Sequence, residues 1–263
     1  METSVNTQDL KKKIEGYLED LSKETDLARK SEAMQKYLEF AAQFHQYSPY
    51  NIMLILLSKP DATEVAGFQT WKKMNRYVKK GEKGIPIFAP LLHKEDSEIE
   101  DSPLVLNGFR IVYVFDVSQT DGEPLPPVPD WKSPEKNAEL TEKLIKFAES
   151  KGIAVVFNEL PGETQGVSRG GLIEIDPSAG TKTLIHEIAH ELMHQFDHCQ
   201  KDRSVKEMEA ESVAYIVAKH FGFEGLQSPN YLALYGIGTK QIVYEMEIIG
   251  RCAENIIKTI SHA

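Results

Sequence analysis

Cysteine and long apolar runs are both scarce in this sequence. Only two cysteines, Cys199 and Cys252, occur in 263 residues, and neither belongs to a CxxC pair. This excludes a disulfide framework and favours a reducing compartment, so we expect a cytoplasmic protein. The longest apolar stretch, YNIMLILL, is far shorter than the roughly 18 residues of a membrane span. The N-terminus, METSVNTQDLKKKIEG, lacks the apolar core of a signal peptide. We therefore expect no membrane partner.

Positive charge is also in short supply. The chain has 30 lysines and arginines against 40 acids, a net charge of −10, which argues against indiscriminate nucleic-acid binding. The deficit is uneven, because residues 1–91 have a balance of +2 and residues 92–263 have a balance of −12. Such asymmetry between the two halves predicts a different partner for each.

Prolines gather at one place. Residues 120–136, TDGEPLPPVPDWKSPEK, hold five of the 13 prolines. Proline fixes φ and removes a backbone donor, so this segment should be extended and not helical. We interpret it as a linker between an N-terminal domain, residues 1–119, and a C-terminal domain, residues 137–263.

The hydrophobic pattern predicts an α+β protein. Before the linker, helical spacing of apolar residues is followed by two strand-like runs. After it, a helix and a strand precede a hairpin that turns near Gly170 and Gly171, and three helices follow. The expected helices span 9–24, 31–44, 48–57, 136–151, 181–198, 206–221 and 239–260, and the expected strands span 85–90, 109–117 and 153–158. The hairpin strand LIEID, 172–176, is expected either as an edge strand that binds an extended peptide or as an ordinary strand.

The motif HEIAH, 186–190, predicts a metal site. His186 and His190 are four residues apart, so both imidazoles project from one helical face and can bind a single Zn²⁺. Glu187 follows the first histidine, beside the metal but turned away from it, which suits a general base. Catalysis leaves one position open for water, so one further protein ligand is expected.

The next predicted helix, with the sequence KEMEAESVAY, offers that ligand. Glu207 and Glu211 lie on or beside its apolar face, and we assign Glu207 to the metal and Glu211 to a histidine N–H. The reverse assignment stays open. Glu209 should point into solvent. His194 and His198 continue the four-residue rhythm, but His194 lies about 12 Å along the axis from the first histidine and cannot share its ion.

A basic and aromatic stretch precedes the first strands. Between Phe68 and Lys94 there are seven lysines or arginines and one acid, interleaved with aromatic residues. Cations that follow phosphates and rings that stack on bases suit a single strand of DNA. The alternative is that Trp71 and Phe88 belong to the core and that the lysines are merely solvated. The candidate DNA-binding residues are Trp71, Lys72, Lys73, Arg76, Lys79, Lys80 and Lys83.

Two known families share longer motifs with the chain. HEIAHELMH followed by EMEAESVAY resembles the zincin-like metallopeptidases of the ImmA/IrrE type. YSPYNIMLI, GFQTWKKMNRYVKKGEKGIPIFAP and VFDVSQTDGEPLP resemble the N-terminal single-stranded-DNA-binding domain of ArdC-type antirestriction proteins. The combined resemblance covers roughly residues 8–225. It implies a mobile-element or antirestriction protein whose partners are single-stranded DNA and a peptide or protein substrate.

The expected activity is therefore that of a gluzincin-like zinc metallopeptidase joined to a DNA-binding domain. Tyr215, Tyr231 and Tyr235 are unranked candidates for polarising the oxyanion. One alternative is a non-enzymatic antirestriction protein with a structural or vestigial metal site. Another is a regulatory peptidase that cleaves a repressor. A His₂–carboxylate site also accepts Mn²⁺ or Fe²⁺ in place of zinc.

Overall fold

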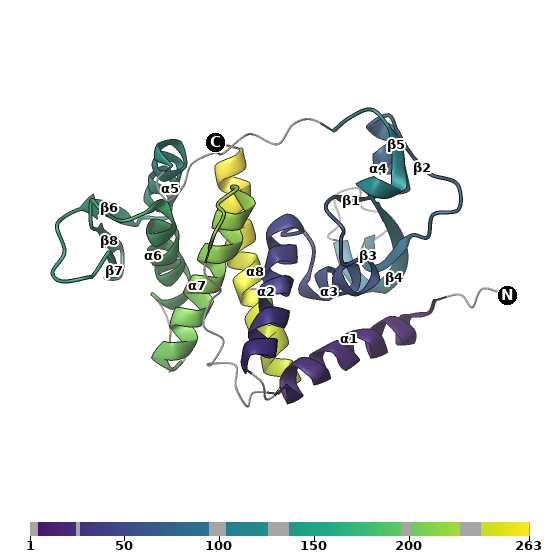
Figure 1. Cartoon of the computed structure of the whole chain (residues 1–263), viewed down its shortest axis with the longest axis horizontal. Coiled ribbons are helices and arrows are strands. Elements are labelled where there is room, and N and C mark those ends of the chain that lie inside the picture. Colours follow the sequence, from purple (N-terminus) through teal and green to yellow (C-terminus); the bar gives the residue numbers. More distant parts are fainter. Residues whose placement is uncertain are drawn as a thin grey trace. The chain divides into compact units, whose positions relative to one another are not determined.

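The chain folds into helices and small sheets, which confirms the predicted α+β class (Figure 1). The computed structural model divides into two compact units, residues 1–17 with 50–126 and residues 18–49 with 127–263. None of its described helices is both long and apolar enough to cross a membrane. The structure describes residues 5–24, 27–94, 104–125, 137–195, 201–226 and 238–262.

These units do not follow the predicted domain ranges 1–119 and 137–263. Helix α2 (Leu27–Gln43) packs on helix α7 (Arg203–His220), so an N-terminal segment belongs to the second unit. His220 Nδ1 forms a hydrogen bond of 3.0 Å with the carbonyl oxygen of Ala42 at the end of this contact. The predicted linker also begins too early, because strand β5 (Thr120–Gly122) belongs to the first unit. Residues 126–136 lie outside the described residues.

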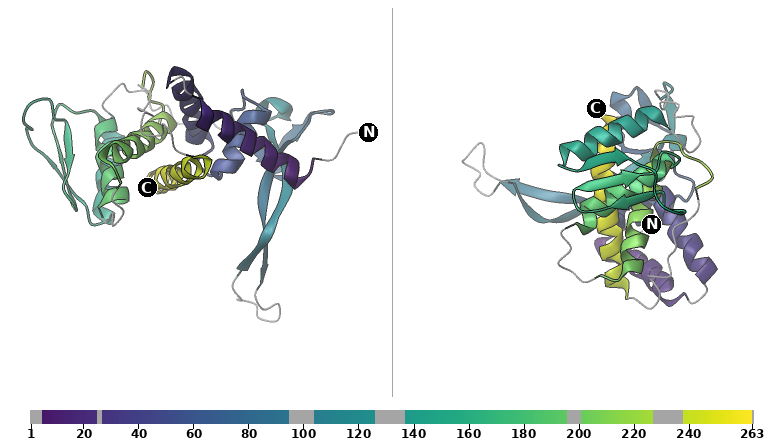
Figure 2. Two further views of the ribbon diagram at one scale, coloured as in Figure 1. Left: turned by 90° about the horizontal axis from the view of Figure 1, so that it is seen from below. Right: turned by 90° about the vertical axis from the view of Figure 1, so that its left-hand side faces the viewer.

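The first unit is built on a three-stranded antiparallel sheet in the order β1-β4-β3. Ile85 pairs with Val114 and Ile87 with Val112, and this face carries the sheet's buried side chains. Figure 2 shows β3 and β4 as a long two-stranded arm. The elements are helix α1 (Thr7–Lys23), which belongs to this unit up to Tyr17, helix α3 (Pro49–Ser58) and strands β1 (Val65–Gly67), β3 (Ile85–Lys94) and β4 (Leu104–Asp116).

Five short elements of this unit escaped the sequence pattern because each has too few residues to display a period. They are strand β1, helix α4 (Phe68–Lys73), strand β2 (Arg76–Val78), the 3₁₀ helix η1 (Val117–Gln119) and β5. Buried Asp116 caps η1 by accepting the Ser118 N–H. The same carboxylate accepts the backbone N–H groups of Thr63 and Glu64, so it fixes the chain that enters β1.

The second unit is mainly helical (Figure 1). Helix α7 packs against α2, α6 and α8, and its inward face is almost continuously buried from Met208 to Ala218. Asn137 caps α5 by accepting the Leu140 N–H at 3.0 Å. The remaining elements are α5 (Ala138–Ser150), β6 (Ala154–Phe157), β7 (Gly166–Ser168), β8 (Leu172–Ile175), α6 (Thr181–His194) and α8 (Thr239–Ser261).

The small sheet of this unit lies beside α6 in the order β6-β8-β7. Gly170 and Gly171 form the predicted hairpin turn, with φ values of 75° and 88° that favour glycine. Strand β8, which contains LIEI, is parallel to β6 and antiparallel to β7, so it is the central strand. The predicted edge role of 172–176 is therefore wrong, and β7 is the edge strand that lies against α6.

Candidate metal centre

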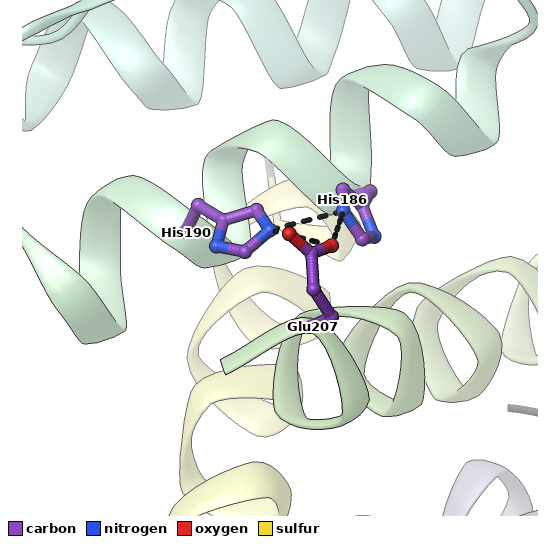
Figure 3. A group of neighbouring side chains, drawn as sticks. All are labelled: His186, His190 and Glu207. Carbon is purple, nitrogen blue, oxygen red and sulfur yellow. Dashed lines mark hydrogen bonds and ion pairs between the residues drawn. The ribbon is translucent and has the colours of Figure 1, made fainter. Parts of the chain in front are cut away.

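Three ligand atoms converge where α6 faces the first turns of α7. His186 Nε2 and His190 Nε2 are 3.0 Å apart, and Glu207 Oε2 lies 3.4 Å from the first and 3.5 Å from the second. Figure 3 shows the Glu207 carboxylate pointing at the two imidazoles. The histidines are largely buried, whereas the carboxylate is half exposed. The sequence predicted this trio, and its role as a ligand set stays a prediction.

These separations suit a small divalent cation. Tetrahedral ligands at 2.0–2.2 Å from an ion lie roughly 3.4 Å from one another. The chemistry of the donors agrees, because two imidazole lone pairs and a carboxylate face one point and repel one another unless positive charge lies there. Burial opposes a charge on His186, but the hydrogen bond with Glu211 and the nearby carboxylates raise its pKa overall. Burial and the neighbouring His186 lower the pKa of His190 to about 4, so this ring is neutral.

Glu187 lies beside the trio and not within it. Its side chain is buried, and the Ser168 backbone N–H donates to its carboxylate. Burial raises the pKa of Glu187, and the charges of Glu207 and Glu191 act in the same direction. A carboxylate held at the edge of β7 with a raised pKa has the properties of a general base.

Glu211 lies behind His186. Its Oε2 is 3.2 Å from His186 Nδ1, and its other oxygen accepts from Lys182. This leaves His186 Nε2 to face His190 and Glu207. The roles assigned to Glu207 and Glu211 stay predictions, and the geometry favours the original assignment over its reverse.

Glu209 is not solvated, and that prediction is wrong. Its side chain is 0% exposed because α8 covers this side of α7 and the chain before α7 supplies Lys201. His194 Nε2 is 2.9 Å from Glu209 Oε2, and His194 Nδ1 is 3.0 Å from His190 Nδ1. Buried Glu245 of α8 completes this cluster. His198 lies outside the described residues.

Sequence reasoning also missed Glu191. This buried carboxylate accepts the Ser168 hydroxyl at 2.6 Å and the backbone N–H groups of Gly170 at 2.8 Å and Gly171 at 2.6 Å. It therefore ties the β7–β8 turn to α6. The available signal was its spacing of four residues from Glu187, which places both carboxylates on one face.

The tyrosine candidates are not supported. Tyr215 is buried in α7, and its hydroxyl donates to Glu39 of α2 at 3.4 Å, so it does not belong to the trio. Tyr231 and Tyr235 lie outside the described residues. No oxyanion donor is assigned from these side chains.

The predicted DNA-binding residues of the first unit have different surroundings. Trp71 is 2% exposed, and its indole N–H donates to the Phe115 carbonyl at 2.8 Å, so its predicted contact with DNA is wrong. Arg76 donates to Thr120 and thereby holds β2 to β5. Lys79 donates to the Ser118 carbonyl at 3.0 Å. The candidates with exposed side chains are Lys72, Lys73, Lys79, Lys80 and Lys83.

Two exposed aromatic side chains of β4 were not among the predicted DNA-binding residues. Phe109 is 56% exposed and Tyr113 is 48% exposed, and alternation along β4 puts both on the face opposite Val112 and Val114. Phe88 of β3 contacts Phe109 edge-on, with ring centroids 6.4 Å apart. We call Phe88, Phe109 and Tyr113 the aromatic face of the sheet. A Cβ atom on Gly84 would lie 2.8 Å from Tyr113 Cβ, so the basic segment 79–83 ends beside this face.

An uncharacterized protein of Bacillus anthracis, pXO2-81, is 28% identical over 248 residues, which is 73% of this chain and 41% of that protein. The chain thus spans about two-fifths of the length of this curated relative.

A metal-free crystal structure of the antirestriction ArdC protein from the R388 plasmid is similar in fold. Its TM-score is 0.51 at 17% identity, covering 82% of this chain and 84% of that one. A Mn(II)-bound structure of that protein gives 0.48 at 16% identity, covering 86% and 96%. The sequence profile of the N-terminal domain of the anti-restriction factor ArdC matches residues 7–157, from α1 to the end of β6. This match covers more than half of the chain, which therefore belongs to the family defined by the ArdC N-terminal domain.

Proposed function

We propose that this chain is an antirestriction protein that binds single-stranded DNA and carries a metal-dependent peptidase site. The observation that carries the peptidase proposal is the convergence of His186, His190 and Glu207 beside the buried carboxylate of Glu187. Three protein ligands suit a catalytic site, because a structural zinc site normally has four. Zinc is the expected metal, with Mn²⁺ or Fe²⁺ as alternatives.

The protein groups around the site suit peptide hydrolysis. When bound, the cation would supply Lewis-acid activation of water and of a substrate carbonyl. Glu187 would accept the proton of the attacking water and pass it to the leaving amine. Strand β7 has a strand neighbour on one side only within the described sheet, and Ser168 of this strand donates to Glu187. An extended peptide added along β7 would therefore bring its carbonyl groups to the general base.

The peptidase proposal is tested on the full chain. Purified protein should bind about one equivalent of zinc, and His186→Ala or His190→Ala should remove most of it, because two remaining ligands hold the ion poorly. Glu187→Gln should keep the zinc and lose turnover of an unfolded protein substrate by about 100-fold or more. Glu174→Gln is the matched control, since that carboxylate of β8 pairs with Arg169. Equal turnover in Glu187→Gln and the wild type would rule out the general-base role.

A second function, binding of single-stranded DNA, is supported by the first unit. The aromatic face offers rings that can stack on unpaired bases, and the segment beside it carries exposed lysines. Such binding would not require a duplex and would show little preference for sequence. Its test is an anisotropy titration of the full chain with a labelled oligonucleotide at several salt concentrations. Binding without hydrolysis would favour the non-enzymatic alternative, and hydrolysis of one repressor alone would favour the regulatory one.

A further inference from the structure

A continuous line of hydrogen-bonding groups leads from the candidate ligand His190 into the core of the second unit. His190 Nδ1 is 3.0 Å from His194 Nδ1, and His194 Nε2 is 2.9 Å from Glu209 Oε2. The other oxygen of Glu209 accepts from Lys201, which lies 3.4 Å from Glu245 Oε2. The line thus joins α6, α7 and α8.

The chemistry of imidazole fixes the proton positions along this line. A neutral imidazole carries one N–H donor and one acceptor nitrogen. Carboxylate oxygens only accept, so His194 donates to Glu209 from Nε2, and in its neutral form it keeps Nδ1 as an acceptor. His190 must then donate from Nδ1, which leaves the lone pair on its Nε2, the atom that faces Glu207 and His186.

The other candidate ligand has a shorter version of the same arrangement. His186 Nδ1 meets Glu211 directly at 3.2 Å, and Glu211 is paired with Lys182. Each histidine of HEIAH therefore has a carboxylate–lysine pair behind its Nδ1. The pair behind His186 is direct, and the pair behind His190 acts through a second imidazole.

Resting on the metal site proposed above, we infer that Glu209 is a positioning residue, which acts through His194 to hold His190 in the tautomer and orientation that bind a metal. Its complete burial keeps water from replacing the hydrogen bond to His194. Lys201 balances the carboxylate charge, so Glu209 stays an acceptor. Groups that orient a ligand in this way typically change metal affinity by about 10–100-fold.

Two measurements on the full chain test this inference. The first is the affinity for zinc alone, measured by competition with a chelating dye. Glu209→Gln and His194→Ala should each weaken zinc binding by about 10-fold or more, and the double variant should be little worse than either. Glu247→Gln is the control, because this carboxylate of α8 pairs with Arg251 and does not belong to the line, and its affinity should match the wild type.

The second measurement needs no variant and no metal. Long-range ¹⁵N–¹H correlation spectra of the metal-free protein should show the Nδ1–H tautomer for His190 and the Nε2–H tautomer for His194. The opposite tautomers would overturn the inference, as would unchanged zinc affinity in folded Glu209→Gln and His194→Ala. A wild-type protein that binds no divalent metal would instead overturn the proposed metal site, together with the inference that rests on it.

Discussion

Gly166 of β7 lies directly against Glu187 of α6. A Cβ atom on Gly166 would fall 2.8 Å from Glu187 Cγ and 2.9 Å from Glu187 Oε1, distances that real Cβ atoms essentially never show. Glycine at this position therefore lets the edge strand touch the proposed general base.

Gly166→Ala should misplace the base without removing the metal. We expect zinc stoichiometry to stay near the wild-type value and peptide turnover to fall by about 100-fold, because small displacements of a catalytic group are costly. Gly238→Ala is the control, since it has open space around its Cβ position and an ordinary φ of −75°. Wild-type turnover in Gly166→Ala would show that the contact between β7 and α6 has no catalytic importance.

The aromatic face should dominate the affinity for single-stranded DNA. Phe109→Ala and Tyr113→Ala should each weaken binding by about 1–3 kcal/mol, the contribution of one stacked base. Tyr50→Ala removes an exposed ring of α3 instead and should leave the affinity unchanged.

The exposed lysines should control the salt dependence of the same interaction. Each of Lys80→Ala and Lys83→Ala should reduce the slope of log affinity against log salt by about 1 if that lysine contacts a phosphate. Salt-dependent binding that survives loss of both rings would place the DNA elsewhere on the protein.

Asp116→Asn should destabilise the first unit. The Asp116 carboxylate accepts three backbone N–H groups while buried, and an amide would turn a donor toward some of them. We expect a loss of about 1–3 kcal/mol in the free energy of unfolding, measured by chemical denaturation. Asp121→Asn changes an exposed carboxylate of β5 and serves as the control. Equal stability of the two variants would contradict this role for Asp116.

Glu245 should make the second unit less stable as pH rises. Burial, reinforced by Glu209, raises the pKa of Glu245 to about 7. An ordinary glutamate in the unfolded chain titrates near 4.3, so between about pH 4.3 and 7 the folded state holds a proton that the unfolded state has released. The stability from this group is therefore lost as pH rises through 7.

Glu245→Gln should remove that dependence. Because the amide cannot ionise, the stability of the variant relative to the wild type should rise by roughly 2–3 kcal/mol between pH 5 and pH 8. Urea unfolding followed by circular dichroism at the two pH values measures the difference. Glu247→Gln, on an exposed part of α8, should behave as the wild type at both. A constant offset between Glu245→Gln and the wild type would contradict the pH argument.

The sequence by itself determined the long helices and which side chains share a face of one helix. A helix of several turns shows the helical period of its apolar residues in the sequence. Six such helices were predicted with bounds similar to those observed: α1, α2, α5, α6, α7 and α8. Spacing within one helix is fixed by helix geometry, so the common face of His186 and His190 followed from their numbers alone. The same reasoning put Glu211 on or beside the apolar face of its helix, and its role toward a histidine stays a prediction.

Only the tertiary structure decided what surrounds each face. Glu209 was predicted to be solvated because it lies on the side of α7 opposite the predicted apolar face. In the structure, α8 and Lys201 cover that side. Trp71 was predicted to stack on DNA bases, but its indole N–H donates to the carbonyl of Phe115 in the core. Phe115 belongs to β4 and pairs with β1. Which strand forms an edge likewise depends on pairing between distant segments. A sequence fixes the direction of a side chain relative to its own element, and packing decides whether that direction leads to water or to another element.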